Sequence, residues 1–559
     1  MPRKHSPKST RRSFLQSAAL GGTAAALTPA LGAARSVSTG AGEPRNSVAA
    51  YEFKASELDE ITIGELQEGL KSGKFTARFL VEKYWVRVSD LDMRTDNGRA
   101  TLNSVIEMNP DALSIADALD KERKAGKLRG PLHGIPVLIK DNIATGDRMM
   151  TTAGSLALVG AKVPKDSFVA QKLRAAGAVI LGKTNLSEWA NIRSSHSTSG
   201  WSGRGGLTKN PYALDRNPCG SSSGTGAGIS ANLAAVGIGT ETDGSIVCPS
   251  SSNGLVGIKP TVGLISRAGI IPISHSQDTP GPMCRTVRDA AILLGVLAGV
   301  DPDDDATASS AGKSQTDYAQ YCDPAGLKGA RIGVARKYFG FNDAVDALME
   351  QSLDVMRKQG AMLIDPADIA TFGKFDDTEL VVFLYELKAD LNAYLARLGP
   401  GAPVRTLKDI IDFNERNREK EMPYFGQDLF LKAQAKGPLT EKEYLGALAK
   451  NYQLARSEGI DALMDKHQLD AIVAPTGSPA WVTDLVNGDH VAGGSSNAAA
   501  VAGYPNINVT AGSIFGLPVG ISFFGRAWSE PTLIRIAYAF EQATKARKPP
   551  RFLPTAGLS

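Results

Sequence analysis

The feature that most constrains this chain is a long run of small residues near its middle. From Cys219 the sequence reads CGSSSGTGAGISANLAAVGIGTETDGSIVCPSSSNGLVGIKP, ending at Pro260. Glycine and serine add little apolar area to a core, and ordering glycine costs more backbone entropy than ordering any other residue. Such a run is tolerable where backbone N–H groups crowd around a ligand and hydroxyl groups point inward. It therefore predicts a binding or catalytic site.

The rest of the chain predicts a layered α/β fold with a buried sheet. It has 559 residues, of which 42% are hydrophobic, only 6% are aromatic and 58 are glycines, a composition that favours such a body over a helical bundle. Apolar runs bounded by glycine or proline alternate with helical patterns, which predicts a mainly parallel sheet with helices on both faces. Because strand signals occur on both sides of a helix-rich region, we expect one composite sheet. The expected strands are 135–139, 178–181, 234–238, 255–258, 331–335, 362–364, 471–474, 507–509 and 519–523.

The first 34 residues have the three regions of an export signal. Basic residues including Arg11 and Arg12 precede an Ala-rich apolar stretch that is too short to span a bilayer, and small residues follow it. The arginine pair followed by Ser-Phe-Leu is similar to a twin-arginine signal. We therefore expect the precursor to use the twin-arginine export machinery. The mature protein is then expected to be periplasmic or secreted, without a membrane anchor.

The signal also accounts for the apparent basic charge. Removing its five basic residues leaves 57 of the 62 basic residues against 58 acidic ones, so the formal charge falls from +4 to −1. A nucleic-acid partner would require a clustered basic surface, and we expect none. The expected organisation is a signal at 1–34, a flexible tether at 35–55, one catalytic domain at 56–545 with a helix-rich insert at about 377–466, and a tail at 546–559.

Four cysteines, Cys219, Cys248, Cys284 and Cys322, are too few for a disulfide scaffold in a chain of this length. A bridge between Cys219 and Cys248 is possible in an oxidising compartment. We nevertheless favour buried thiols, since free cysteine is commonly buried.

Two familiar motifs occur in unsuitable surroundings. GAVILGKT, at 177–184, matches the phosphate-loop pattern, but its interior resembles a strand and a helical pattern precedes it. GSSSG, at 220–224, matches a nucleophile elbow centred on Ser222, yet no buried strand precedes it. That elbow, with His275, His467 or His490 as its partner, is the alternative mechanism.

A lysine and two serines offer a different chemistry. Lys140 ends an apolar stretch, and burial there would lower the pKa of its ammonium group enough to give a neutral amine base. Ser221 and Ser245 lie in the Gly-rich run, so an amine base and hydroxyl groups are available together. The six histidines are far apart and have no partners at metal-ligand spacing, so we expect no metal and no other cofactor.

The motifs KDN (140–142), GSSSG (220–224), TETDGSIVCP (240–249) and GLVGIKPTVGLISR (254–267) together resemble the amidase signature family. The resemblance covers roughly 56–543 and implies a large twisted mixed sheet surrounded by helices. It also implies a serine amidohydrolase with a Ser–cis-Ser–Lys triad. That triad falls on Lys140, Ser221 in the cis peptide, and Ser245 as nucleophile. The oxyanion hole would be formed by Thr242, Asp243, Gly244 and Ser245.

Within that family, the strings CGSSSG and TETDGSIVCP look most like those of bacterial peptide amidases, which release ammonia from C-terminal peptide amides. The expected substrate is thus a small amide or a short peptide amide. One alternative is an amidase for aryl, fatty-acid or aliphatic amides. Others are the amidotransferase component that shares these motifs and works on tRNA-linked glutamine, and a non-catalytic amide-binding module.

Overall fold

The computed structural model describes residues 56–92 and 102–558. The expected export signal at 1–34 and the expected tether at 35–55 lie outside these residues. Within the described residues, no helix combines the length and the apolar character needed to cross a membrane.

Strands from almost the whole chain form one 11-stranded mixed sheet within the described residues, in the order β1-β3-β2-β6-β8-β7-β12-β13-β11-β9-β10. A separate two-stranded ribbon joins β4 and β5. The strands are β1 Val105–Met108, β2 Pro136–Lys140, β3 Val179–Thr184, β4 Trp201–Ser202, β5 Gly206–Leu207, β6 Val236–Glu241, β7 Val256–Lys259, β8 Thr279–Cys284, β9 Arg331–Val334, β10 Met362–Ile364, β11 Ala471–Pro475, β12 Asn506–Ile514 and β13 Leu517–Phe524.

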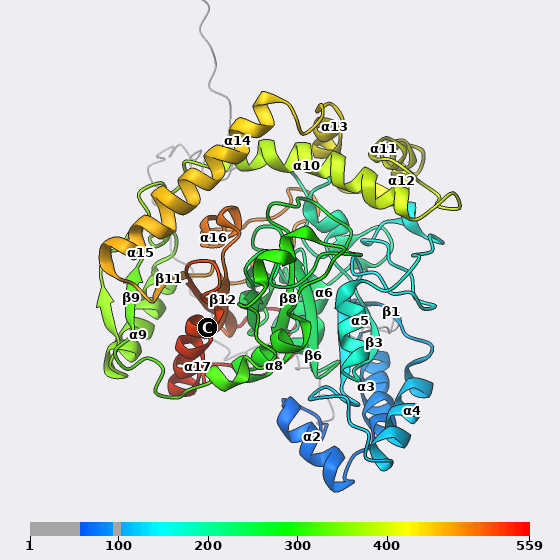
Figure 1. Ribbon diagram of the computed structural model, residues 1–559, viewed down its shortest axis with the longest axis horizontal. Helices are drawn as coiled ribbons and strands as arrows, with labels where there is room; N and C mark the ends of the chain where they lie inside the picture. Colours follow the sequence, from blue (N-terminus) through cyan, green and yellow to red (C-terminus); the bar gives the residue numbers. More distant parts are fainter. Residues whose placement is uncertain (1–55, 93–101, 559) are drawn as a thin grey trace, which may run out of the picture.

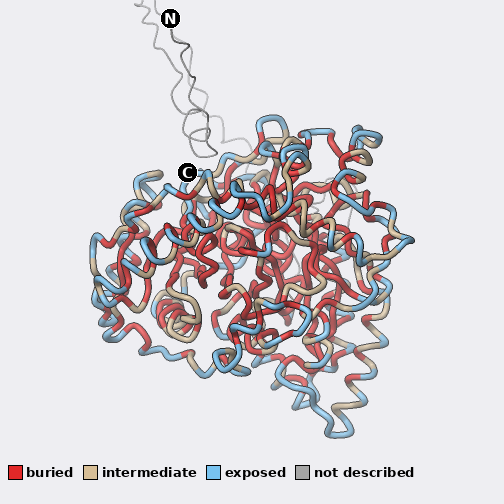
Figure 2. The backbone as a smooth tube through the Cα atoms, turned by 45° about the horizontal axis from the view of Figure 1, so that its top comes forward, coloured by how far each residue is buried: buried red, intermediate tan, exposed pale blue. Residues whose placement is uncertain are grey.

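Helices cover both faces of this sheet (Figure 1), and buried residues fill the middle of the molecule (Figure 2). The α-helices are α2 Ile63–Ser72, α3 Ala77–Leu91, α4 Ala112–Lys124, α5 Phe168–Ala175, α6 Ser223–Ser230, α7 Val247–Ser252, α8 Val287–Leu297, α9 Asp343–Lys358, α10 Asp376–Arg397, α11 Leu407–Arg416, α12 Arg418–Glu421, α13 Asp428–Gln434, α14 Lys442–Tyr452, α15 Asp461–His467, α16 Asn497–Ala502 and α17 Glu530–Thr544. A π-helical turn, Gln453–Ile460, joins α14 to α15.

The strand β2 shows why the central strands are continuous apolar runs. Its Val137 and Ile139 pack into the core that contains α5, α8 and α17, whereas Leu138 packs into the opposite core with α3 and α4. Successive side chains of a strand point to opposite faces, so a strand covered on both faces needs apolar residues at every position. Lys140, at the end of β2, is therefore on the same face as Leu138.

The expected composite sheet is confirmed, since β9 and β10 precede the helix-rich insert while β11, β12 and β13 follow it. Helices α10 to α14 of the insert form a layer along one side of the molecule (Figure 1). The expectation of a mainly parallel sheet is wrong, because β8, β7, β12 and β13 are antiparallel to their neighbours. Helical segments separate some of these strands in sequence, but alternation along the chain does not fix which strands become neighbours.

The central strand β8 has no sequence signal of its own. It reads TPGPMC, and proline ordinarily argues against a central strand because it has no N–H for the ladder. Here β7 pairs only with Met283 and Cys284, so Pro280 and Pro282 lie where this neighbour makes no ladder. A shortened ladder on one side is what accommodates two prolines.

The phosphate-loop match at 177–184 is a strand, as its interior suggested. Val179–Thr184 is β3, fully buried and hydrogen-bonded to β1 and β2, so its backbone cannot wrap around a phosphate.

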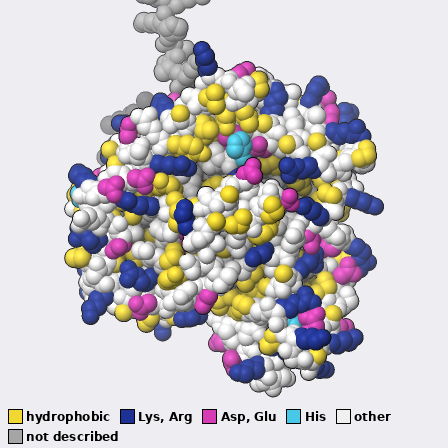
Figure 3. Space-filling view, in the orientation of Figure 1, with side chains coloured by type: hydrophobic (Ala, Val, Ile, Leu, Met, Phe, Trp, Pro, Cys, Tyr) yellow, Lys and Arg dark blue, Asp and Glu magenta, His cyan; other side chains and the backbone are white. Residues whose placement is uncertain are grey.

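The surface charges are mixed, in line with the nearly equal numbers of basic and acidic residues in the sequence. Lys and Arg are interspersed with Asp and Glu on the face in Figure 3.

Candidate active site

The candidate site is built on the carboxyl end of β2. Lys140 is completely buried there, and its Nζ lies 2.7 Å from Ser221 Oγ. The same Nζ lies 2.9 Å from Thr240 Oγ1 and 3.2 Å from the Thr240 carbonyl oxygen, at the end of the neighbouring strand β6. Asn142 Nδ2 donates to Thr240 Oγ1 at 3.0 Å and fixes that hydroxyl. Two strand ends therefore hold the lysine against one serine hydroxyl.

The environment of Lys140 favours the neutral amine. Burial lowers its pKa to about 7, against the opposing effect of the carboxylates of Asp278 and Glu241. Desolvation disfavours a charged form more strongly than a neutral one, which is the physical cause of the shift. An amine with a pKa in this range can accept and return a proton near neutral pH.

The loop before α6 presents Ser221 to the lysine. The Gly220–Ser221 peptide bond is cis, in agreement with the resemblance. Ser187 N donates to the Ser221 carbonyl oxygen at 3.1 Å. A Cβ on Gly220 would lie 2.2 Å from Ser187 Oγ, and one on Gly224 would lie 2.3 Å from the Ser104 carbonyl oxygen. The small residues of this run are therefore required by close backbone packing.

Ser245 lies at the entrance to this arrangement. Its carbonyl oxygen accepts from Ser222 N at 3.2 Å, which joins the two serine loops, and the residue is 9% exposed. It lines a cavity of about 300 Å³, together with Gly220, Thr242, Asp243 and Gly244. We call this the front cavity. Ser245 is thus the residue of the expected triad that borders the space open to a substrate.

The loop from β6 to α7 has the backbone geometry of an anion-binding turn. Glu241 Oε2 accepts from the N–H groups of Ile246 and Val247, at 2.7 and 3.0 Å. Among the described residues, no backbone or side-chain acceptor binds the N–H groups of Asp243, Gly244 or Ser245. Gly244 has a φ of 80°, a conformation that glycine adopts without steric cost. These N–H donors remain available at the edge of the front cavity.

The expectation of buried thiols is wrong for one cysteine pair. Cys219 and Cys248 form a disulfide, with Cα atoms 6.0 Å apart and a sequence separation of 29. Cys284 and Cys322 are free and buried, as expected. The general preference of cysteine for burial could not show that the two serine loops place Cys219 beside Cys248. The bridge joins the loop of Ser221 to the helix that follows Ser245.

No sequence pattern signalled the role of the insert in this site. Glu379, on α10, accepts from Gln277 Nε2 at 3.0 Å and from Asn497 Nδ2 at 2.9 Å. Gln277 Nε2 also donates to the Thr242 carbonyl oxygen at 3.3 Å. A helix residue 102 positions from Gln277 in sequence therefore supports the loop of Ser245. Only the folded chain brings these polar side chains together.

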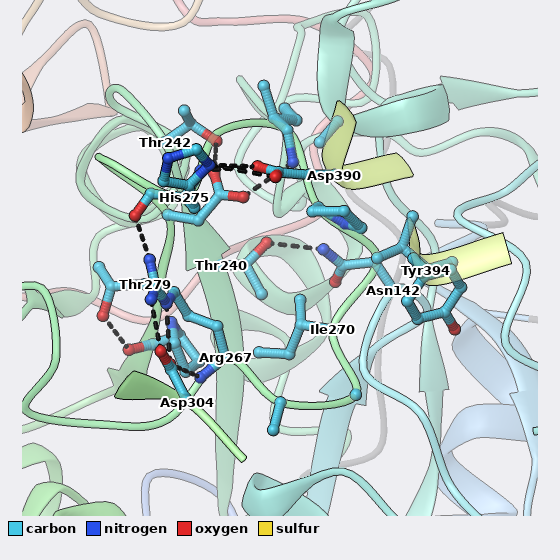
Figure 4. A pocket seen from close by; sticks show the side chains of 18 of the residues that line it. Asn142, Thr240, Thr242, Arg267, Ile270, His275, Thr279, Asp304, Asp390 and Tyr394 are labelled. Atoms are coloured by element: carbon cyan, nitrogen blue, oxygen red, sulfur yellow. Dashed lines mark hydrogen bonds and ion pairs between the residues drawn. The ribbon is translucent and has the colours of Figure 1, made fainter. Parts of the chain in front are cut away.

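A second cavity, of about 220 Å³, lies on the other side of Thr242 and contains Asn142, Thr240 and Asp278 among its lining residues. In this rear cavity, acids and bases are paired (Figure 4). Arg267 binds Asp304 with its Nε at 2.8 Å, and His275 Nδ1 lies 2.8 Å from Asp390 Oδ2.

The nucleophile-elbow alternative finds no support in this geometry. Ser222 is completely buried, and its Oγ donates to the Thr240 carbonyl oxygen at 3.1 Å. His275 contacts Asp390, Glu386 and Tyr444, and His490 contacts Asp484. Within residues 56–92 and 102–558, no hydrogen bond joins Ser222 to a histidine side chain.

Comparisons with known proteins agree over nearly the whole described chain. The Amidase family model matches residues 88–534. The X-ray structure of native peptide amidase from Stenotrophomonas maltophilia is 49% identical, has a TM-score of 0.84, and covers 89% of this chain and 99% of that one. A probable amidase of Arabidopsis thaliana is 45% identical over 505 residues, 89% of this chain and 92% of the relative. A component of glutamyl-tRNA(Gln) amidotransferase from Acinetobacter baumannii is 33% identical over 500 residues, 88% and 97% of the two chains.

Proposed function

Because this chain belongs to the amidase signature family and is an amide hydrolase, we propose that it converts the C-terminal carboxamide of peptides to the free acid and ammonia. The reaction would proceed through an acyl-enzyme on Ser245, with Ser221 and Lys140 as the proton-transfer pair. The observation that carries this proposal is the buried Lys140 Nζ, 2.7 Å from Ser221 Oγ, in a loop that is hydrogen-bonded through Ser222 N to the carbonyl oxygen of Ser245, which borders the front cavity.

Each group has a defined part in the proposed reaction. Neutral Lys140 accepts the proton of Ser221, Ser221 accepts the proton of Ser245, and Ser245 Oγ attacks the carboxamide carbon. The oxyanion that forms is stabilised by the N–H groups of Asp243 and Gly244 and by that of Ser245 itself, with Thr242 shaping the start of the loop. Removal of one comparable donor in another hydrolase costs about 3 kcal/mol of transition-state stabilisation.

The proton then returns by the same route. Ser221 protonates the amide nitrogen, the C–N bond breaks and ammonia leaves. Water repeats the sequence on the acyl group, gives its proton to the same relay, and releases the acid from Ser245. The Lys140–Ser221 pair ends the cycle in its starting protonation state, so these residues supply the proton transfers without a cofactor.

The peptide class of substrate has separate support. The chain is 49% identical to the Stenotrophomonas peptide amidase, and the match extends over 99% of that chain, so it spans the segments that line the front cavity. The amidotransferase component has lower identity, 33%. On the face shown in Figure 3, basic and acidic side chains are interspersed. A tRNA-dependent reaction would instead require clustered basic residues to bind the phosphates.

Ammonia release from a C-terminally amidated dipeptide tests the proposal, with Ser245→Ala as the test variant. Ser309→Ala removes the hydroxyl of an exposed serine and is the matched control. We expect release by the wild type and the control, and none by Ser245→Ala. Full activity of a folded Ser245→Ala protein would refute the nucleophile assignment.

Other substrates separate the remaining alternatives. Hydrolysis of aryl or fatty amides without hydrolysis of peptide amides would keep the mechanism and overturn the substrate class. Binding of an amide with no hydrolysis of any amide would favour a binding module. Ser222→Ala should keep most of the activity, whereas an elbow mechanism predicts that it abolishes turnover.

We also propose that the precursor is exported by the twin-arginine machinery to the periplasm or beyond. The motif around Arg11 and Arg12 supports this, and the Cys219–Cys248 disulfide suits an oxidising compartment. Replacing both arginines with lysine should leave the precursor in the cytoplasm, as cell fractionation would detect. Unchanged export of that variant would contradict the assignment.

A further inference from the structure

The front cavity has a buried part and an exposed part. Gly220, Thr242 and Ser245 line it and are buried, whereas Ser195 and Asn487 line it and are exposed. In a C-terminal peptide amide the leaving group is ammonia, so the whole peptide lies on the acyl side of the carbon that reacts. A peptide whose carboxamide reaches Ser245 must therefore continue toward the exposed part of the cavity.

A turn at 194–197 forms one wall of that exposed part, and all four of its residues line the cavity. We call it the rim turn. His196 N donates to Ser194 Oγ at 3.2 Å, and Ser197 Oγ donates to the Ser194 carbonyl oxygen at 2.9 Å, so the turn has a defined shape. Serine hydroxyl groups can both donate and accept hydrogen bonds. The rim turn therefore has polar groups that suit the N–H and C=O groups of a peptide main chain.

A residue of the helix-rich insert holds the rim turn from outside the cavity. Asp428, at the start of α13, does not line the cavity, and its Oδ1 accepts from Ser194 Oγ at 2.8 Å and from Ser195 N at 2.9 Å. Its Oδ2 accepts from Ser195 Oγ at 2.8 Å. The next residue of α13, Leu429, donates its N–H to the Arg193 carbonyl oxygen at 3.2 Å. The start of α13 is thus hydrogen-bonded to three successive residues of the chain that enters the rim turn.

The carboxyl group of Asp428 is ionised at neutral pH. Burial would raise its pKa, but the hydrogen bonds from Ser195 and Ser194 outweigh this effect and lower the pKa to about 2. Hydrogen bonds to a charged acceptor are stronger than those between neutral groups. The contact between Asp428 and the rim turn is therefore a strong one for a side chain that is partly exposed.

The chain after the rim turn is anchored to a second segment of the cavity lining. Ser199 N donates to Asp489 Oδ1 at 3.0 Å, and Asp489 lines the cavity. A Cβ on Gly488 would lie 3.1 Å from the His196 carbonyl oxygen, so the two backbone segments are in close contact. The rim turn is therefore held between α13 and the segment at 487–489, and Asp428 provides the contact on the α13 side.

We infer that the rim turn binds the peptide residues that precede the carboxamide-bearing one, and that Asp428 is a positioning residue that keeps this binding surface in shape. The inference rests on the proposed hydrolysis of peptide amides. It gives the insert a part in recognising substrate length, because only a substrate with residues beyond the one bearing the carboxamide reaches the rim turn. Recognition of main-chain groups also tolerates different side chains at those positions.

The test compares two blocked substrates that differ only in the number of residues before the carboxamide-bearing leucine: N-acetyl-leucine amide and N-acetyl-alanyl-alanyl-leucine amide. Ammonia release gives kcat and KM for the wild type and for Asp428→Ala. Asp412→Ala is the matched control, because Asp412 pairs with Lys408 on α11 as Asp428 pairs with Lys432 on α13, four residues away in each case. Lys432→Met removes the ion pair of Asp428 and leaves its contacts with the two serines.

We expect the wild type to hydrolyse the longer substrate at least about tenfold more efficiently, as one or two additional hydrogen bonds would provide. Asp428→Ala should lower kcat/KM for the longer substrate severalfold more than for the shorter one, mainly through KM. Asp428→Asn should fall between, because its amide oxygen can still accept from Ser195 N. Asp412→Ala and Lys432→Met should keep the wild-type ratio of the two substrates.

Equal efficiency of the wild type on the two substrates would overturn the inference and leave the proposed function intact. An equal loss on both substrates in a folded Asp428→Ala protein would show that Asp428 only stabilises the fold. If thermal melting shows that Asp428→Ala is unfolded, Ser195→Ala gives the same test, since it removes an exposed hydroxyl that Asp428 binds, and an unchanged ratio there would contradict the inference. Failure of the wild type to hydrolyse either substrate would instead count against the peptide-amide proposal itself.

Discussion

Lys140 and Lys183 end neighbouring parallel strands of one sheet, yet they have different surroundings. Lys140 pairs in register with Thr184, and Ile139 pairs with Lys183, so the two lysines point to opposite faces. Both are completely buried, and burial lowers the pKa of Lys140 to about 7 and that of Lys183 to about 8. Burial alone therefore does not distinguish a catalytic lysine.

The hydrogen-bond partners distinguish them. Lys183 Nζ donates to the Ile143 carbonyl oxygen at 2.6 Å and to Thr151 Oγ1 at 2.9 Å, and neither of those residues lines the front cavity. A neutral Lys140 has two N–H donors for the oxygens of Thr240 and a lone pair for the proton of Ser221. A structural lysine holds loops together through hydrogen bonds. A catalytic base instead needs a neighbouring hydroxyl through which protons can be transferred to and from the substrate site.

The largest effect should come from removing the amine that contacts the serine. Lys140→Met should lower kcat/KM for a peptide amide by about 10³-fold or more, since a positioned base contributes on the order of 10²–10⁴. Melting curves should show a folded protein, because methionine fits an apolar strand end. Substantial activity in this variant would remove Lys140 from the mechanism.

The neighbouring lysine should show the opposite pattern. Lys183→Met should lower the free energy of unfolding by about 3 kcal/mol, because the Ile143 carbonyl and the charge of buried Asp141 lose their compensation. Denaturant unfolding measures this, with exposed Lys408→Met as the control. A folded Lys183→Met protein that is as inactive as Lys140→Met would invalidate the distinction between the two lysines.

The surroundings of Lys140 also differ from those of Lys183 in having a covalent link. The Cys219–Cys248 disulfide joins the loops around Lys140. Replacing both cysteines with alanine should cost about 3 kcal/mol of stability, from the length of the loop that the bridge closes. We also expect a severalfold loss of kcat/KM as the serine loops become less well positioned. Cys322→Ala removes a thiol that is not bridged and is the control. Equal stability and activity in the double variant would show that hydrogen bonds alone hold these loops.

The pH dependence of kcat/KM gives the most detailed comparison of the two lysines. In the proposed mechanism the neutral amine of Lys140 is the reactive form, and it predominates above its pKa of about 7. Below that pH, kcat/KM should fall about tenfold per unit, because an ammonium cannot accept the proton of Ser221. Lys183→Met should leave this midpoint unchanged. A profile without an acidic limb below pH about 7 would contradict a lysine base.

The lowered pKa of Lys140 also makes the free energy of unfolding depend on pH. Lys140 has a pKa of about 7 in the folded protein and a reference value of 10.5. The unfolded chain therefore binds more protons between these values, and the free energy of unfolding rises with pH in that window. Lys140→Met should make this rise shallower, as denaturant unfolding at the two ends of the window would show.

Much of the fold could be predicted from local sequence because its strands are buried on both faces. Continuous apolar runs identified β2, β3, β6 and β7, with ends that differ by one to three residues from those observed. Strand β8 could not be found in this way, since its prolines are acceptable only because the ladder to β7 is short. Likewise, no local pattern predicts that Glu379 of a distant helix supports the loop of Ser245.

The sequence by itself determined the reactive groups: a lysine at the end of an apolar strand, two serines in a run of small residues, and motifs specific enough to indicate the family. Only the tertiary structure decided their surroundings. It buried Lys140 beside Ser221, sequestered Ser222 against Thr240, joined Cys219 to Cys248 and lined the front cavity with acids. The physical reason is that pKa, exposure and pairing depend on neighbours brought together by the sheet order, which short-range sequence patterns do not encode.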